Sequence, residues 1–331
     1  MRMSDSERKL IMLNVAVIGV GNMGKHHARV YSEIANLVAV CDLDERLGKE
    51  IARRFKCKFY PTYKEMFAKE KIDAVSIVVP TIYHKKVALD CIEQGKHVLV
   101  EKPISNNLED ARQMVEAARK KNVRIAVGHV ERFNPAVQKL REMIKNKDLG
   151  KITTIVARRV GVCPPQIKDA NVIIDTAVHD IDVLRFLLEE DPTKIHALSG
   201  KAILRQRDDY ADILLKFDGT DAFIQVNWIT PVKIRSLAVT GTEGYAELNY
   251  ITQELTLHKS NYRRIDDFSD VVKFGTPKEV KVSIKNGEPL KNELMNFLDA
   301  VENNREPLVS GKEGLKTLEV ALKVIDSCNG S

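Results

Sequence analysis

A histidine and two carboxylates lie along one predicted helix at a spacing that could support proton transfer. In the segment 175–189, Asp175, His179 and Asp182 stand at i, i+4 and i+7, so they share one polar stripe of the helix. The opposing, buried stripe is apolar and consists of Ala177, Ile181, Leu184 and Leu188. A carboxylate and a histidine one turn apart are more often a surface pair than a catalytic pair. Lys102, at the end of a predicted strand, changes that balance, because a cleft between two domains would let it meet His179.

The element that must support these groups is a strand, a glycine turn, a helix and a second strand within residues 14–42. Residues 15–18 form a short apolar run, typical of a parallel strand that is covered on both faces. Gly19, Gly21 and Gly24 follow in the pattern G-x-G-x-x-G. The first glycine permits the tight turn, the second lets a pyrophosphate approach the backbone, and the third allows the helix to pack closely on the strand. The helix would then direct its free N–H groups at the phosphates.

Asp42 indicates which dinucleotide this turn would hold. It stands about 20 residues beyond the glycines, after a second apolar run, where a carboxylate would bind the adenosine ribose hydroxyls. A 2′-phosphate at that place would meet a negative charge, so the sequence favours NAD over NADP. A glycine pattern alone is weak evidence, but here strand, helix, strand and acid all stand in the required order.

Composition restricts the class of protein. At 331 residues the chain is long enough for two domains that share a cleft, and 44% hydrophobic with 30% charged residues is typical of a soluble globular protein. The net charge of +6 comes without the aromatic-interleaved basic patch that single-stranded nucleic acid requires. Five scattered cysteines without C-x-x-C indicate a reducing cytoplasm. We therefore expect a cytoplasmic protein that binds no membrane, nucleic acid or metal.

The chain changes texture near its middle. Up to residue 128, apolar strands alternate with amphipathic helices, which predicts an α/β fold with a doubly wound parallel sheet, a Rossmann domain. From Lys151 onward, longer alternating runs separated by turns predict an α+β domain with a large open antiparallel sheet. We expect an NAD-binding domain over residues 1–128 and a substrate-binding and oligomerisation domain over 129–331, whose last helices pack back near the first domain.

Three hallmarks, in this order, resemble a known family. They are the glycine turn, the triplet Glu101-Lys102-Pro103, and Asp175 with His179 and Asp182. The family is that of glucose-fructose oxidoreductase and inositol dehydrogenase (Gfo/Idh/MocA), NAD(P)-dependent sugar dehydrogenases, and the resemblance runs from about Leu13 to Ser327. Pro80 with His84, and the run GHVERFNPAV with Arg132 and Asn134, also look like family segments.

Two departures from the family pattern concern the shape of the substrate pocket. Ala177 stands where the family often has a glycine two residues before the histidine. Val172 and Ile173 replace the paired glycines that usually precede the aspartate. The reactive groups themselves are intact.

The resemblance implies that Lys102 and His179 both approach the hydroxyl being oxidised, and that Asp175 contacts the substrate or steadies the histidine. Hydride leaves a carbinol carbon more easily as the hydroxyl proton leaves, and an imidazole is a base near neutral pH. We prefer His179 as the base with Lys102 as an orienting donor, but Lys102 could be the base if burial lowered its pKa. A cis-like turn at Pro103, which the family implies, would aim Lys102.

The expected contacts form two sets. Those with the cofactor are Gly19, Gly21, Asn22, Met23, Gly24, Asp42, Pro80, His84, Glu101 and Lys102. Those with the substrate are Lys102, Arg132, Asn134, Arg158, Asp175 and His179. We expect His26 and His27 on a solvated helix face. A few basic side chains of the second domain could also hold a diphosphate, the candidates being Arg158, Arg159, Lys168, Arg205, Arg207, Lys233 and Arg235.

These observations predict an NAD-dependent dehydrogenase that oxidises a secondary hydroxyl of a sugar or sugar derivative. GHVERFNPAV and NVIIDTAVHDID look most like the branch that oxidises the 3-hydroxyl of UDP-N-acetylglucosamine-type nucleotides. Inositol or a free hexose is the rival substrate. A dinucleotide-sensing regulator is a different class, and a reductase of a substrate such as biliverdin would need a flat apolar pocket in place of arginines.

The open face of the predicted antiparallel sheet must be covered. We expect Ile213, Leu215, Phe223 and Trp228 to pack sheet to sheet between subunits, in a homodimer or homotetramer.

Overall fold

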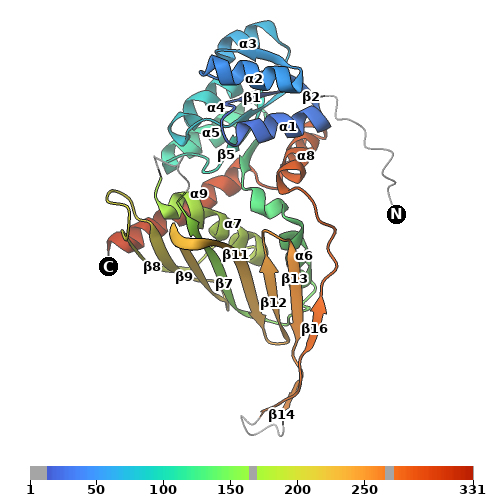
Figure 1. Ribbon diagram of the computed structural model, residues 1–331, viewed down its shortest axis with the longest axis vertical. Helices are drawn as coiled ribbons and strands as arrows, with labels where there is room; N and C mark the ends of the chain where they lie inside the picture. Colours follow the sequence, from blue (N-terminus) through green and yellow to red (C-terminus); the bar gives the residue numbers. More distant parts are fainter. Residues whose placement is uncertain (1–12, 164–169, 265–271, 331) are drawn as a thin grey trace. The chain divides into compact units, whose positions relative to one another are not determined.

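A computed structural model describes residues 13–163, 170–264 and 272–330, and the chain divides into two compact units (Figure 1). Unit 1 consists of Met1–Val130 and Leu290–Leu318, and unit 2 of Glu131–Pro289 and Glu319–Ser331. Lys168, one of the basic candidates for a diphosphate, lies outside the described residues. Over the described ranges, no helix combines the length and the apolar character that crossing a bilayer would demand.

Unit 1 is built on a six-stranded parallel sheet with the strand order β3-β2-β1-β4-β5-β6. The strands are β1 (Asn14–Ile18), β2 (Asn36–Cys41), β3 (Lys58–Tyr60), β4 (Ala74–Ile77), β5 (His97–Glu101) and β6 (Ile125–Gly128). The helices between them are α1 (Gly24–Ile34), α2 (Glu45–Phe55), α3 (Tyr63–Lys69), α4 (His84–Glu93) and α5 (Leu108–Lys120). The strand order reverses between β1 and β4, the point at which a doubly wound sheet opens a crevice for its ligand. The predicted Rossmann sheet is thus confirmed.

Burial explains the composition of these elements. Val15 and Val17 of β1 and Leu99 of β5 are completely buried between helices, as the uniformly apolar runs predict. Three helices begin at a residue whose side chain accepts a backbone N–H of the first turn, namely Asp44, Thr62 and Asn107. Helix α8 (Pro289–Glu302) adds Leu294, Phe297 and Leu298 to the same core, so a segment from the end of the chain completes this unit.

Unit 2 contains an eight-stranded sheet with the order β16-β13-β12-β11-β7-β10-β9-β8. Its strands are β7 (Ile152–Val162), β8 (Lys194–Gly200), β9 (Tyr210–Lys216), β10 (Asp221–Asn227), β11 (Ile229–Gly241), β12 (Gly244–Asn249), β13 (Glu254–Lys259) and β16 (Lys278–Lys281). The predicted large antiparallel sheet is confirmed with one difference, since β10 pairs with β7 in parallel. The helical segments of this unit are η2 (Val130–Phe133), α6 (Pro135–Lys145), the π-helical turn η3 (Ile173–Ala177), α7 (Val178–Leu188) and the end of α9 (Gly311–Asn329). The sequence pattern did not predict α6.

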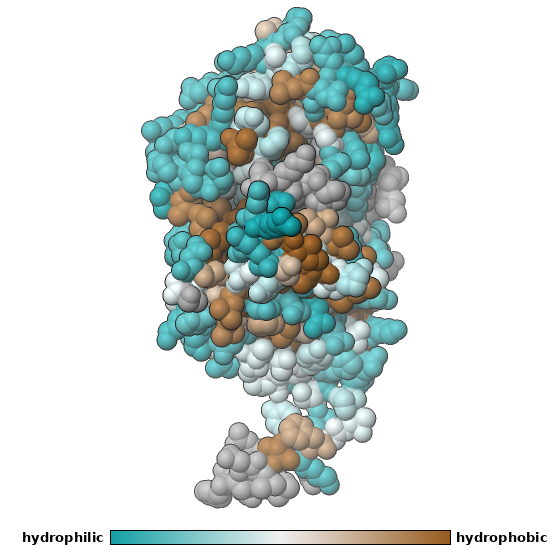
Figure 2. Space-filling model, turned by 60° about the vertical axis from the view of Figure 1, so that its left-hand side comes forward, coloured by the Kyte–Doolittle hydropathy of each residue, from teal (hydrophilic) through white to brown (hydrophobic). Residues whose placement is uncertain are grey.

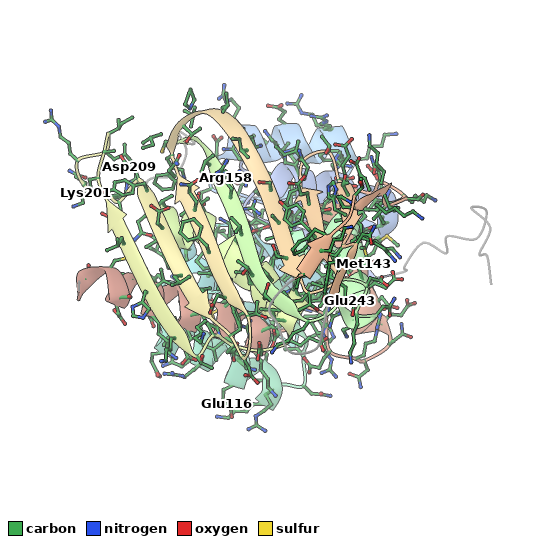
Figure 3. The ribbon with its side chains drawn as sticks, turned by 90° about the horizontal axis from the view of Figure 1, so that it is seen from below. Glu116, Met143, Arg158, Lys201, Asp209 and Glu243 are labelled. Carbon is green, nitrogen blue, oxygen red and sulfur yellow. The ribbon has the colours of Figure 1, made fainter. Side chains whose placement is uncertain are left out.

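Strand register shows which face of this sheet is open. Val156 of β7 lies opposite Phe223 of β10, which lies opposite Leu214 of β9, and all three side chains are exposed. Seen from below, no helix covers this face of β7 to β10 (Figure 3). Phe223 thus lies on the open face of the sheet, where we expected it to be available to another subunit.

The other three residues expected on that face are on the opposite side of the sheet. Ile213 and Leu215 are completely buried, and Trp228 is nearly so. Successive residues of a strand alternate between faces, so Ile213 and Leu215 flank the exposed Leu214 and point into the unit's own core. The prediction that these residues contact another subunit was wrong, because the sequence pattern did not show which of the two alternating sets of side chains faces outward.

A two-stranded hairpin, β14 (Tyr262–Arg264) and β15 (Val272–Phe274), extends beyond the large sheet (Figure 1). The ring centroids of Tyr262 and Phe274 lie 5.9 Å apart, and both side chains are exposed. The space-filling view shows hydrophobic residues where this hairpin extends from the sheet (Figure 2).

Candidate active site

The glycine turn after β1 has a geometry that only glycine satisfies at two of its three positions. Gly19 has a φ of +86°, in the left-handed region that L side chains rarely adopt. A Cβ on Gly24 would lie 1.9 Å from the carbonyl oxygen of Gly19, so α1 can begin this close to the strand only because the side chain is absent. A Cβ on Gly21 would meet nothing within 4 Å, which leaves open space beside an exposed backbone. Asn22 and Met23 complete the turn and are exposed.

Asp42 closes this turn from the end of β2. One of its carboxylate oxygens accepts the backbone N–H of Val20 at 2.7 Å, and the other accepts that of Asp44 at 2.8 Å. A carboxylate has about four lone-pair positions, so two hydrogen bonds orient it and leave acceptor capacity for ribose hydroxyls. The open backbone at Gly21 and the oriented carboxylate of Asp42 therefore fit a dinucleotide.

Exposed apolar side chains follow the strands that end at this crevice, a signal that the motif alone did not provide. Leu43 follows β2 and is 89% exposed, while Ile82 and Tyr83 follow β4 and are also exposed. Met23, in the glycine turn, is also exposed. Pro80 precedes Ile82 and Tyr83, is itself exposed, and begins the short 3-10 turn Thr81–Tyr83.

Buried hydrogen bonds link α1 to the end of β5. His27 is completely buried, and its Nε2 lies 3.0 Å from Oε1 of Glu101 while its Nδ1 lies 3.1 Å from the hydroxyl of Ser76. The expectation that His27 lies on a solvated helix face was wrong, although the adjacent His26 is exposed. Glu101 also accepts the backbone N–H of Lys102 at 3.1 Å. Burial raises the pKa of Glu101, but the hydrogen bond and charge of His27, with Lys102, lower it by more, so the carboxylate is ionised.

His84 supports the same segment from α4. Its Nδ1 lies 2.9 Å from the carbonyl oxygen of Pro103, and its Nε2 lies 2.9 Å from that of Val79. The Lys102–Pro103 peptide is cis, as the family resemblance implied. Burial lowers the pKa of His84 by more than the two carbonyl oxygens raise it. His84 and Glu101, both expected to bind the cofactor, thus also hold the backbone on either side of Lys102, whose side chain is half-buried.

In unit 2, a π-helical turn presents Asp175. The turn closes i to i+5 over Ile173–Ala177 and leads directly into α7, and such turns are frequent at functional sites. The Thr176 hydroxyl donates to Oδ2 of Asp175 at 3.2 Å and accepts the indole N–H of Trp228 at 3.0 Å. This chain of hydrogen bonds orients Asp175 from Trp228, the residue that follows β10. His179, half-buried, follows in the first turn of α7.

The predicted polar stripe of this helix does not include Asp182. Its carboxylate is buried and receives a bidentate ion pair from Arg132, with distances of 2.7 and 2.8 Å. Asp180 is also completely buried, so α7 has a core on nearly all sides. Both carboxylates lie inside the unit, where buried arginines pair with them.

Two residues expected to contact substrate have structural roles here. The guanidinium of Arg132 is buried on Asp182. Asn134 caps α6 by accepting the N–H of Ala136 at 3.1 Å, and its amide donates to the carbonyl oxygen of Tyr250 at 3.1 Å. The N-cap followed by Pro135 is a helix-start signal that could have predicted α6.

A second buried arginine is Arg159, one of the basic residues that the sequence offered as candidates for a diphosphate. Arg159 donates to both oxygens of Asp180, at 2.8 and 3.1 Å, and to Glu131 at 2.9 Å. Its guanidinium carbon also lies 4.8 Å from the centroid of the Tyr250 ring. Burial alone would lower the pKa of Arg159, but the two carboxylates raise it well above its usual value.

Arg159 and Asp175 line one pocket, with a volume of about 470 Å³, that lies within unit 2. The remaining lining residues are Val160, Gly161, Val162, Cys163, Thr176, Asn227, Trp228, Pro231, Lys233 and Arg235. Arg158, the residue predicted to bind substrate, does not line it. Because Arg158 is adjacent to Arg159 on β7, it points to the opposite, open face of the sheet (Figure 3).

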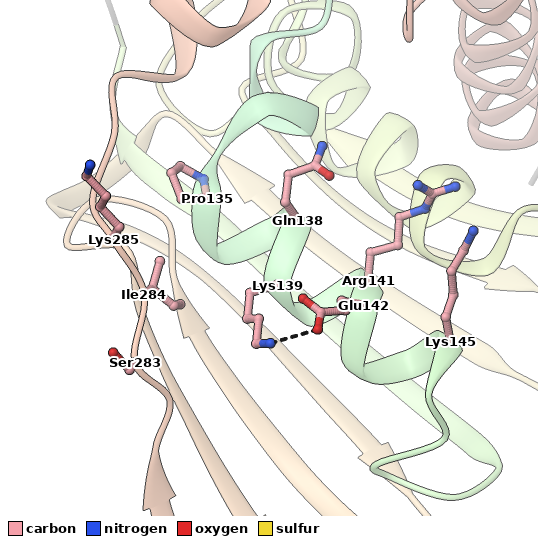
Figure 4. A pocket seen from close by; sticks show the side chains of 9 residues that line it. All are labelled: Pro135, Gln138, Lys139, Arg141, Glu142, Lys145, Ser283, Ile284 and Lys285. Carbon is pink, nitrogen blue, oxygen red and sulfur yellow. Dashed lines mark hydrogen bonds and ion pairs between the residues drawn. The ribbon is translucent and has the colours of Figure 1, made fainter. Parts of the chain in front are cut away.

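Another pocket, of about 550 Å³, shows no comparable chemistry (Figure 4). It lies between α6 and residues 283–285 of the same unit. Its basic side chains are largely paired, Lys139 with Glu142 at 2.9 Å and Lys145 with Glu189 at 2.6 Å. The candidate residues therefore lie in two places, at the glycine turn and Lys102 in unit 1 and in the pocket that contains Asp175 in unit 2.

These features define a class. A Rossmann unit with an oriented acid after its second strand, together with a unit built on a large open sheet, is typical of a two-domain nicotinamide-dependent oxidoreductase. Residues 13–129 match the family model described as "Oxidoreductase family, NAD-binding Rossmann fold", and residues 137–247 match the "GFO/IDH/MocA C-terminal domain". The chain belongs to the Gfo/Idh/MocA family, as the sequence motifs indicated, and is an NAD(P)-dependent oxidoreductase acting on CH–OH groups, with NAD as its cofactor.

Individual relatives cover nearly the whole chain. It is 27% identical to the UDP-N-acetylglucosamine 3-dehydrogenase of Acidithiobacillus ferrooxidans over 95% of this chain and 97% of that protein. A solved structure of that enzyme superposes with a TM-score of 0.85 at 26% identity, covering 96% of this chain and 98% of the other. The scyllo-inositol 2-dehydrogenase (NAD(+)) of Bacillus subtilis is 26% identical over 94% of this chain and 93% of its own length.

Proposed function

We propose that this protein oxidises a secondary hydroxyl of a sugar nucleotide with NAD, and that the best candidate is the 3-hydroxyl of a UDP-N-acetylglucosamine-type substrate. The observation that carries the proposal is the end-to-end similarity to a UDP-N-acetylglucosamine 3-dehydrogenase, which includes the unit that would hold the substrate. Lys102, Asp175 and His179 are all present, and Asp175 lines a pocket large enough for a ligand.

NAD, when bound, supplies an acceptor for the hydride. In the proposed roles, His179 takes the hydroxyl proton, because an imidazole titrates near neutral pH. Lys102 donates to the oxygen of the same hydroxyl and orients it, on a backbone that Glu101 and His84 hold. Asp175 accepts a hydrogen bond from the substrate or from the histidine, with its own orientation set by Thr176.

A second candidate, oxidation of an inositol, has a specific observation in its favour. The scyllo-inositol dehydrogenase relative is nearly as similar, at 26% identity over 94% of this chain. The charged lining of the Asp175 pocket is compatible with either substrate, whereas a reductase of a flat apolar substrate would require a lining without Arg159, Lys233 and Arg235.

The test is NADH formation from a panel of UDP-sugars, free hexoses and inositols. We expect the highest kcat/KM with a UDP-N-acetylhexosamine, and a loss of at least about hundredfold in kcat on Lys102→Ala, because positioned proton donors and acceptors contribute about that much. NADH binding, followed by fluorescence, should be retained.

Lys120→Ala removes the same charge from an exposed position of unit 1 and serves as the matched control. A preference for inositol would replace the proposed substrate with the second candidate. NADH binding without turnover of any panel member would favour the dinucleotide-sensing regulator.

We further propose that the protein is a homodimer or homotetramer whose subunits associate through the open face of the large sheet. The row Val156, Phe223 and Leu214 places three exposed apolar side chains side by side on adjacent strands. A second copy presents an identical row, so a twofold contact would cover both.

A further inference from the structure

Two cations of the Asp175 pocket have no partner of opposite charge among the described residues. Arg159 is already bound to Asp180 and Glu131. Lys233 and Arg235 line the same pocket, yet neither side chain makes an ion pair or a hydrogen bond with any other residue that the structure describes. Most surface lysines and arginines need no partner, but Arg235 is half-buried, and an unpaired charge is costly there.

The strand register concentrates these charges. Arg235 of β11 lies directly opposite Arg159 of β7, so the two guanidinium groups project from the same face of the sheet. Lys233 precedes Arg235 by two residues. Its Cα lies 3.7 Å from the position that a Cβ atom on Gly161 would occupy. Glycine at position 161 therefore leaves room beside Lys233, on the wall of the pocket.

Electrostatics shows that the site is short of negative charge. Burial and the neighbouring charge of Arg159 lower the pKa of Arg235. The charge of Arg235, followed by burial, lowers the pKa of Lys233. Glu131, Asp180 and Asp175 act in the opposite direction on Arg235 without cancelling the shift, and the first two already bond Arg159. An incoming anion would relieve the remaining repulsion.

We propose that Lys233 and Arg235 form the subsite that receives the diphosphate of the substrate. The proposal rests on the proposed sugar-nucleotide oxidation and deepens it by assigning the residues that recognise the charged part of the molecule. A guanidinium presents a planar fork that matches phosphate oxygens, and a lysine adds a point charge beside it. Asp175 on the same pocket would repel a phosphate but accept a sugar hydroxyl, so the lining separates the two ends of one substrate.

The experiment measures binding of UDP and of inorganic pyrophosphate to the NADH-loaded protein by titration calorimetry. Lys233→Ala and Arg235→Gln should each weaken UDP binding by about tenfold to hundredfold, because hydrogen bonds to charged groups contribute about that much. The weakening should be smaller in high salt, where the electrostatic part is screened. Arg235→Lys should restore part of the affinity, since it keeps the charge but not the fork.

The matched control is the double variant Lys194→Ala/Lys259→Ala, which removes two positive charges from exposed positions of β8 and β13. It should bind UDP as the wild type does. An equal loss in the control would show only a general charge effect and would overturn the subsite. Lys233 is exposed, so Lys233→Ala should fold even if Arg235→Gln does not, and unchanged UDP affinity in Lys233→Ala would also overturn it.

Turnover separates this proposal from the proposed function. If both hold, the two variants raise KM for the UDP-sugar with little change in kcat, because they remove binding shared by ground and transition states. Turnover of a UDP-sugar with an unchanged KM in both variants would refute the subsite alone. A third outcome is that both variants weaken UDP binding but the protein oxidises no UDP-sugar. That outcome would support the subsite and refute the proposed reaction.

Discussion

His27 Nε2 and Glu101 Oε1 lie 3.0 Å apart inside unit 1, where no part of His27 is exposed to solvent. The same carboxylate accepts the backbone N–H of Lys102. A buried contact between α1 and the end of β5 thus holds the backbone of the residue that we propose orients the reacting hydroxyl. Neither residue type is unusual, but their pairing joins α1 to the segment that carries Lys102.

Replacing His27 should therefore affect stability. His27→Ala leaves Glu101 without its partner in a mostly buried position, and we expect a loss of about 3 kcal/mol in the free energy of unfolding. His27→Gln, which keeps a donor, should lose less. Urea unfolding followed by circular dichroism would measure both. The control is His26→Ala at the exposed neighbouring position, whose free energy of unfolding should stay within about 0.5 kcal/mol of the wild type. If His27→Ala also lost only about 0.5 kcal/mol, the importance of the His27–Glu101 pair would be contradicted.

The glycine turn offers a pair of substitutions with opposite consequences. Gly24→Ala places a methyl group against the carbonyl of Gly19, so we expect a clear drop in Tm. Gly21→Ala adds a methyl group in open space, so the protein should fold normally but bind NADH about tenfold or more weakly, since the methyl group would occupy the approach of the pyrophosphate. Calorimetry and fluorescence titration would separate these effects. Unchanged NADH affinity in Gly21→Ala would place the pyrophosphate elsewhere.

Asp209 predicts a specific dependence of stability on pH. It is completely buried and accepts the backbone N–H groups of Ala202, Ile203 and Leu204. Burial raises the pKa of Asp209, but these hydrogen bonds lower it by more than burial raises it. The net pKa is therefore below the usual value of an aspartate. A carboxyl whose pKa is lower in the folded state stabilises the fold above its unfolded pKa of about 3.9, and that contribution is lost as pH falls through the folded pKa.

Asp209→Asn should thus lower the free energy of unfolding by about 1 to 3 kcal/mol at neutral pH, because an amide has a single, neutral acceptor oxygen and at least one of the three backbone N–H groups loses its acceptor. The difference from the wild type should shrink as the pH falls below about 4. The exposed Asp218→Asn is the control. If the difference in unfolding free energy between the wild type and Asp209→Asn stayed constant down to the lowest pH, the ionised carboxylate of Asp209 would not be the source of that difference.

The open sheet face can be tested by a single charge. Leu214→Asp places a carboxylate at one end of the exposed apolar row, directly opposite the central Phe223. Burying this charge between subunits would be costly. We expect light scattering at micromolar concentration to show a dimer or tetramer for the wild type and a smaller mass for this variant. Ile203→Asp, at an exposed loop position of the same unit, should keep the wild-type mass. A monomeric wild type would end the proposal.

The sequence by itself determined the nature of unit 1. Residues 14–42 identify their own fold, because each step depends only on neighbours: an apolar run buried on both faces, glycines where a side chain would collide with backbone, and an acid after the next strand. The family hallmarks Glu101-Lys102-Pro103 and Asp175 with His179 are equally local, so they could be found without coordinates. The alternating runs after Lys151 predicted a large open sheet for the same reason.

The tertiary structure decided which polar residues are buried and which face of each strand is open. Asp182, Arg132 and His27 looked available because an isolated segment cannot show a partner 50 or 74 positions away. Arg158 and Arg159 are chemically identical in sequence, yet strand parity sends only Arg159 into the pocket. The opposition of Arg235 and Arg159 likewise depends on the register between β11 and β7, a long-range property that no local pattern encodes.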